Sequence, residues 1–205
     1  MSAASFMRQR FIRLGPVYLV GIGLGFVTLV YAVAIGLWPA ALLLPNMALM
    51  AVGLPALPFL PPYSPVLYPA NYAAWSLLFE LIANFVFALV VLKSRSMVGV
   101  LLAIGAIGLI VVATTQGALS AGFSWQTLPI ALARVTFSFF AGVVTYNVWS
   151  RYRPPFAIPM LVQVAAMLAV FVIPAQGGAR IAVDLGAVMI VFPALIFFGA
   201  NDAPR

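Results

Sequence analysis

The fold and the function depend on one stretch of the sequence, Ala74-Trp75-Ser76-Leu77-Leu78-Phe79-Glu80-Leu81-Ile82-Ala83-Asn84. It opens an apolar run that continues to Leu92, long enough to cross a bilayer. Glu80, one of only three acidic residues, lies inside this run, and Ser76 and Asn84 share its helical stripe at i−4 and i+4. A charged side chain in hydrocarbon costs about 2.5–3.5 kcal/mol and faces the bundle interior. The stripe therefore indicates either a functional polar site or a buried carboxyl that only holds helices together.

The composition excludes a soluble protein. Of the 205 residues, 65% are hydrophobic and 6% are charged, and the mean hydropathy is +1.18. Soluble domains carry about 25% charged residues, so this chain has too few charges to coat a soluble surface. Several long apolar runs predict a polytopic membrane protein of the all-α class, with residues 1–205 forming a single integral-membrane domain.

The net charge of +7 does not indicate a nucleic-acid partner. The ten basic residues form short clusters between apolar runs, which is the pattern that the positive-inside rule produces in membrane proteins. The sequence has no cysteine and no histidine, so it offers no disulfide framework, no thiol chemistry and neither the commonest general base nor the commonest metal ligand. We therefore expect a lipid bilayer as the surroundings and no metal site.

Six membrane spans are expected, with a basic entry segment at residues 8–13. Residues 39–54 form an apolar run of about half a span, which predicts a re-entrant or interfacial segment. The proline-rich stretch at residues 55–69 is expected to be an ordered or semi-rigid, non-helical loop at the membrane interface. The glycines at positions 21, 23 and 25 are expected to allow close helix packing. The expected spans are residues 14–37, 74–92, 97–113, 128–149, 156–173 and 181–200.

The basic clusters predict the topology. If residues 39–54 re-enter the membrane, the clusters at residues 8–13, 93–95 and 151–153 all fall on one side, which the positive-inside rule makes cytoplasmic. Both termini are then cytoplasmic. Glu80, Arg134 and Asp184 converge at one depth near the outer side.

Three motifs stand out along the sequence. They are Arg10-Phe11-Ile12-Arg13 followed by Pro16-Val17-Tyr18, then Trp75-Ser76-Leu77-Leu78-Phe79-Glu80, then Arg134 followed by Phe139-Phe140-Ala141-Gly142 and Tyr146. In their order and spacing these motifs resemble those of the membrane-bound type-3 acyltransferases, which acylate bacterial surface polysaccharides, lipopolysaccharides and some secondary metabolites. The resemblance covers essentially the whole chain.

The sequence departs from the family pattern in three places. Gly15 stands where the family usually has an aromatic residue, and the aromatic often found after the glutamate is replaced around Asn84. The family also begins with about two further spans, the first of which carries a histidine. We therefore expect this chain to be the C-terminal two-thirds of such an enzyme, to depend on a separate two-helix segment as a partner, and to be inactive alone.

The resemblance implies an O-acyltransferase of the bacterial inner membrane. Such an enzyme moves an acetyl or other acyl group from cytoplasmic acyl-coenzyme A, its co-substrate, to a hydroxyl of a cell-envelope saccharide or lipid-linked acceptor. It implies that Arg10 and Arg13 bind the donor phosphates, since guanidinium groups pair with phosphate bidentately. The alternative is that these arginines are ordinary positive-inside anchors.

The resemblance also implies a catalytic pair and an acceptor site. Glu80 orients or deprotonates a polar partner, and Arg134 is its expected counter-ion; a purely structural salt bridge is the alternative. Trp75, Ser76 and Asn84 are the candidates for the acceptor site, although Trp75 also suits the aromatic belt at the membrane interface.

A different class of function stays open, that of a transporter or an accessory membrane subunit without chemistry. Broken helices and charges inside the membrane suit transporters as well. Against this, the sequence shows no second broken segment in a matching position, which an inverted repeat would supply.

Overall fold

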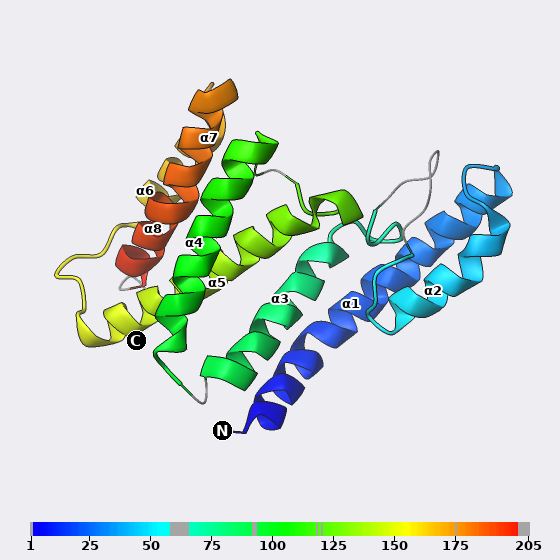
Figure 1. Cartoon of the computed structure of the whole chain (residues 1–205), viewed down its shortest axis with the longest axis horizontal. Coiled ribbons are helices and arrows are strands. Elements are labelled where there is room, and N and C mark those ends of the chain that lie inside the picture. Colours follow the sequence, from blue (N-terminus) through cyan, green and yellow to red (C-terminus); the bar gives the residue numbers. More distant parts are fainter. Residues whose placement is uncertain are drawn as a thin grey trace. The chain divides into compact units, whose positions relative to one another are not determined.

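The structure is a computed structural model that describes residues 2–57, 66–91, 94–117, 119, 121–174 and 176–200 (Figure 1). Within these ranges no strand is present, and a single isolated bridge joins Val66 and Ser124. The predicted all-α class is therefore confirmed. The α-helices are α1 (Ala3–Ala34), α2 (Leu43–Ala51), α3 (Ala74–Val86), α4 (Met97–Gln116), α5 (Leu128–Arg151), α6 (Met160–Val172), α7 (Gly177–Gly186) and α8 (Phe192–Gly199).

Four apolar helical stretches in the described part of the chain are long enough to cross a membrane. A π-helical turn at Ala187–Val191 joins α7 to α8, and another at Phe87–Val91 extends α3. The remaining two expected spans are shorter apolar helices, Ala74–Val90 and Met160–Val172. The four long stretches are Ala3–Ala34, Met97–Gln116, Trp125–Arg151 and Gly177–Gly199.

Three expected spans begin at residues other than the first residues of their helices. The helix of the last expected span begins at Gly177 rather than at residue 181. The first helix begins at Ala3 rather than at residue 14, because the Ser2 side chain caps it by accepting from the Ser5 N–H at 3.2 Å, so the basic entry segment is helical. The fifth expected span begins at Met160 rather than at residue 156, because Pro159 cannot donate a backbone hydrogen bond and occupies the N-cap.

The chain divides into two compact units. The first comprises Met1–Ser94 with Ala121–Leu132, and the second comprises Arg95–Ser120 with Ala133–Arg205. In the second unit α4 packs on α7 and α6 packs on α8. Gly105 lets α4 approach α5 closely, since a Cβ atom there would meet the Phe137 backbone nitrogen at 2.5 Å. The expectation of one integral domain stays a prediction.

In the first unit α2 and α3 both pack against α1 (Figure 1). At nine residues α2 is too short to span a bilayer, as expected for the half-length run. Pro45 is tolerated because it lies in the first turn, where backbone N–H groups have no intrahelical partner. Asn46 is buried and ties α2 to the following loop, donating to the Leu42 carbonyl at 2.6 Å and accepting from the Leu57 N–H at 2.9 Å.

The described ends of the proline-rich loop are ordered and non-helical, as predicted. Ala56 N–H donates to the Leu67 carbonyl at 2.7 Å, and Leu67 N–H donates to the Phe123 carbonyl at 2.9 Å. The indole of Trp125 donates to the Ala56 carbonyl at 3.1 Å. These bonds tie the loop to residues 121–127. The prolines at 58, 61, 62 and 65, together with Tyr63 and Lys93, lie outside the described residues.

Of the glycines at positions 21, 23 and 25 on α1, two do allow close packing, although the partner is the end of this loop rather than a helix. A Cβ atom on Gly25 would stand 1.8 Å from the Ala70 carbonyl oxygen, and one on Gly21 would stand 2.6 Å from the Asn71 amide nitrogen. Gly23 has open space around it. The loop backbone therefore lies directly on the glycine face of α1.

We predict that Gly25→Val destabilises the protein by at least about 3 kcal/mol, since the new side chain would meet backbone that cannot move aside. The matched variant Gly23→Val places the same side chain two residues away in open space and should change stability by no more than about 0.5 kcal/mol. Thermal unfolding of both variants in detergent checks this. Equal melting temperatures would mean that the loop does not lie on Gly25.

Candidate functional site

Two of the motifs meet in an ion pair between α1 and α3. The Arg13 Nη2 atom lies 3.6 Å from the Glu80 Oε1 atom. The Arg13 side chain is 64% exposed and the Glu80 side chain is 36% exposed. Residues that are far apart in the sequence, and that were singled out separately, therefore stand together in one site.

The geometry of this pair leaves Arg13 available to a ligand. A separation of 3.6 Å is longer than the 2.7–3.2 Å range of a direct N–H···O hydrogen bond. A guanidinium has five N–H donors, and a single loose carboxylate contact leaves most of them unused. Exposed pairs of this kind stabilise a protein by only about 0–1 kcal/mol. The pair is therefore a poor structural link and a suitable place for an anion to bind.

Arg10 is the second basic residue of the motif and lies one turn before Arg13 on the same face of α1. Its Cζ atom stands 5.0 Å from the centre of the Phe6 ring, within cation–π range. Phe6 is itself buried and packs against Phe87 with ring centres 5.5 Å apart. The Arg10 guanidinium is thus positioned by a buried ring and needs no carboxylate partner.

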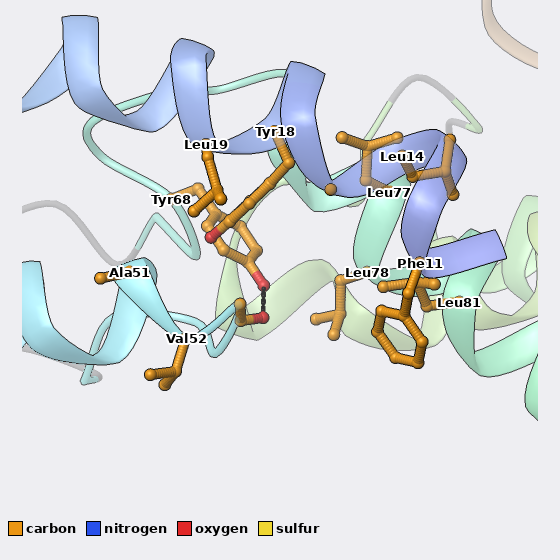
Figure 2. Close-up of a pocket in the computed structure, with 12 residues that line it drawn as sticks. Phe11, Leu14, Tyr18, Leu19, Ala51, Val52, Tyr68, Leu77, Leu78 and Leu81 are labelled. Carbon is orange, nitrogen blue, oxygen red and sulfur yellow. Dashed lines mark hydrogen bonds between the residues drawn. The ribbon is translucent and has the colours of Figure 1, made fainter. Parts of the chain in front are cut away.

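Beside the ion pair the first unit contains a largely apolar cavity of about 210 Å³ (Figure 2). Leu14 and Leu81, the residues that follow Arg13 and Glu80, both line it. The other lining residues come from α1, from the turn after α2, from the loop and from α3; they are Phe11, Gly15, Tyr18, Leu19, Ala51, Val52, Gly53, Tyr68, Leu77 and Leu78.

The two tyrosines of the cavity direct their hydroxyl groups to backbone carbonyls. Tyr18 donates to the Met50 carbonyl, and Tyr68 donates to the Gly53 carbonyl at 2.8 Å, the bond drawn in Figure 2. Their rings meet edge to face with centres 6.3 Å apart. Burial raises the pKa of the Tyr68 hydroxyl, and the neighbouring Tyr18 raises it further, so Tyr68 remains a donor at neutral pH. Because both hydroxyl groups are hydrogen-bonded to the backbone, the surface that the cavity presents to a ligand consists mostly of carbon atoms.

Gly15 opens this cavity. It lines the wall, and a Cβ atom placed on it would meet nothing within 4 Å. The absence of a side chain at this position leaves the space empty, and this consequence could not be anticipated from the sequence alone.

The three acceptor-site candidates have different surroundings. Trp75 packs edge to face on Phe79 at 6.0 Å and lies close to Gly122, which favours a packing role. Ser76 is exposed and donates to the Ala73 carbonyl of its own helix at 2.9 Å. Asn84 is 1% exposed and donates to the Glu80 carbonyl at 2.8 Å, while its Oδ1 atom has no hydrogen-bond partner in the described part of the structure. Asn84 is therefore the candidate with an unused buried acceptor.

Arg134 lies on α5 in the second unit, where it lines a different cavity together with Arg180 and Asp184. Glu80 belongs to the first unit, so its pairing with Arg134 stays a prediction. The ion pair that the structure gives Glu80 is the one with Arg13, which the sequence analysis did not predict. Arg13 belongs to the basic segment expected on the cytoplasmic side, so this contact contradicts the expected place of Glu80 near the outer side. No group of three metal-ligating side chains occurs among the described residues.

Comparison with known proteins gives no match to this chain, whether with family models, with curated proteins or with solved structures.

Proposed function

We propose that this chain is a membrane O-acyltransferase that uses acyl-coenzyme A to acylate a hydroxyl of a cell-envelope saccharide or a similar acceptor. The supporting observation is that the Arg10–Arg13 motif and the Trp75–Glu80 motif meet in one ion pair beside an apolar cavity. A donor of this class needs cationic groups for its phosphates next to an apolar space for its acyl chain. The first unit offers both.

In the proposed reaction the acceptor oxygen attacks the thioester carbonyl, a C–O bond forms, the C–S bond breaks and the coenzyme leaves as its thiol. Arg10 and Arg13 hold the donor phosphates, because the planar guanidinium matches phosphate bidentately. When a donor phosphate binds to Arg13, the Arg13 side chain leaves Glu80, with which it forms only a loose ion pair at 3.6 Å. The freed carboxylate then accepts a hydrogen bond from the acceptor hydroxyl and orients it. Transfer itself is expected to need a histidine-bearing segment, since this sequence has no histidine.

The acyl chain occupies the cavity that Gly15 opens. A cavity of 150 Å³ lined by carbon is large enough for benzene, so about 210 Å³ takes a chain of several methylene groups. Each buried methylene contributes about 0.8 kcal/mol. Chain length should therefore affect donor affinity strongly.

The proposal places the protein in the bacterial inner membrane with both termini in the cytoplasm, where acyl-coenzyme A is available. Reporter fusions after Arg95 and after Arg153 check this topology. Both should report cytoplasm, because the basic clusters of the sequence then share one side. A reporter found outside the cell at either position would show that residues 39–54 cross the membrane.

Donor binding tests the arginine motif. We expect Arg13→Gln to weaken binding of octanoyl-coenzyme A to the purified chain at least tenfold by calorimetry in detergent, since it removes a charge-assisted phosphate contact. Arg8→Gln removes the same charge from an exposed position outside the motif and should change affinity less than twofold. Glu80→Gln should leave donor affinity intact or improve it, yet abolish acyl transfer once the histidine-bearing segment is supplied. Donor binding without any transfer by the unaltered chain and that segment would favour a transporter.

Chain length tests the cavity. Gly15→Phe should fill the open space and weaken octanoyl-coenzyme A binding at least tenfold, while acetyl-coenzyme A binding changes less than twofold. Gly23→Phe, also in open space on α1 but outside the cavity, is the matched control and should affect neither donor. If Gly15→Phe weakens both donors equally, the acyl chain does not enter this cavity.

A further inference from the structure

The end of α5 carries a cluster of aromatic and basic side chains that the proposed reaction does not use. Arg153 lies over the ring of Trp149, with its Cζ atom 3.9 Å from the ring centre, well within cation–π range. Trp149 in turn lies beside Tyr146, with ring centres 6.3 Å apart. Arg151 is the last residue of α5, and both arginines are exposed. These four residues are called the α5 terminal cluster below.

The positive charges of this cluster are not neutralised within the part of the chain that the structure describes. The ion pairs of the described residues join other side chains, so neither Arg151 nor Arg153 is paired with a carboxylate there. The contact of Arg153 with Trp149 supplies no oxygen acceptor, so the planar fork of N–H donors remains available to an anion. The cluster therefore presents two positive charges that a ligand can reach.

The length of α5 places the cluster at the membrane surface. The helix has 24 residues, which at 1.5 Å per residue extend over about 36 Å, more than the roughly 30 Å of the hydrocarbon core. Because arginine is costly in hydrocarbon, the end that carries Arg151 is the one that extends into the headgroup region. Tyrosine and tryptophan are enriched at this depth. The anions that a membrane presents there are the phosphate groups of its lipids.

We propose that the α5 terminal cluster binds the headgroup of an anionic phospholipid. Arg153, oriented by the ring of Trp149, donates to the lipid phosphate, since the fork of a guanidinium matches two phosphate oxygens. Arg151 adds a second positive charge near the same helix end. Two positive charges favour a lipid with a net negative charge over a zwitterionic lipid, whose ammonium group they repel. This binding does not depend on acyl transfer.

The test is native mass spectrometry of the full chain in an uncharged detergent, titrated with phosphatidylglycerol or with phosphatidylcholine. Both lipids carry a phosphate, but only phosphatidylglycerol has a net charge. We expect phosphatidylglycerol to bind at least tenfold more tightly. Arg153→Gln should weaken its binding about tenfold, because it removes both the charge and the hydrogen-bonding fork. Arg153→Lys keeps the charge but loses the planar fork and should weaken binding about fivefold.

Arg95→Gln is the matched control, because it removes an exposed arginine elsewhere in the same unit, and it should leave affinity within twofold of the original. The site is overturned if both lipids bind equally, if Arg153→Gln has no more effect than Arg95→Gln, or if Arg153→Lys binds as the original chain does. Displacement of the lipid by excess inorganic phosphate also overturns it, since the site would then serve a soluble anion. Melting temperatures without lipid show whether each variant is folded, and the preference of the unaltered chain for phosphatidylglycerol needs no variant.

Discussion

The first unit depends on the contact between the loop backbone at Ala70 and the glycine face of α1. There is no room for a side chain between them, since a Cβ atom on Gly25 would stand 1.8 Å from the Ala70 carbonyl oxygen. This contact fixes the segment that carries Tyr68 and that leads directly into α3 at Ala74. α3 then packs along α1 and brings Glu80 to Arg13. The ion pair and the cavity beside it are both consequences of this close packing.

In the first unit, neutral polar side chains are hydrogen-bonded to the backbone, whereas the charged side chains Arg13 and Glu80 form only a loose ion pair. Tyr18, Tyr68 and Asn46 direct their polar atoms to backbone groups and hold the helices and the loop in register. Buried neutral groups of this kind are stable only when they are hydrogen-bonded. Arg13 and Glu80 are loosely paired and partly exposed, so they remain available to a ligand. The framework is thus fixed by neutral groups, while the charged groups can exchange partners.

The linings of the two cavities differ in their chemistry. In the first unit, carbon walls and engaged tyrosines suit an apolar chain, with arginines nearby for an anionic group. In the second, two arginines and one aspartate form part of the wall itself. Only 6% of the residues are charged, and three of them, Arg134, Arg180 and Asp184, line the second cavity. The first cavity is lined by no charged side chain, and the Arg13–Glu80 pair lies beside it.

The sequence by itself determined the class of the protein and the helical stripe that three polar residues share. Its composition required an all-α membrane protein, and the spacing of Ser76, Glu80 and Asn84 defined a helical stripe. Local sequence signals also predicted the positions of most helices. The N-caps Ser2 and Pro159 make α1 and α6 begin at residues other than those predicted.

Only the tertiary structure decided which partner Glu80 meets and that the absence of a side chain at Gly15 leaves a cavity. Periodicity fixes the direction in which a side chain points, but not which distant element lies opposite, and the pairing with Arg134 that was favoured on charge and depth stays a prediction. Arg13 reaches Glu80 because α1 and α3 pack together through a loop that lies on glycine. The cavity exists because side chains from four separate segments surround a position that has none. Both depend on contacts between residues far apart in the sequence, and no local pattern contains that information.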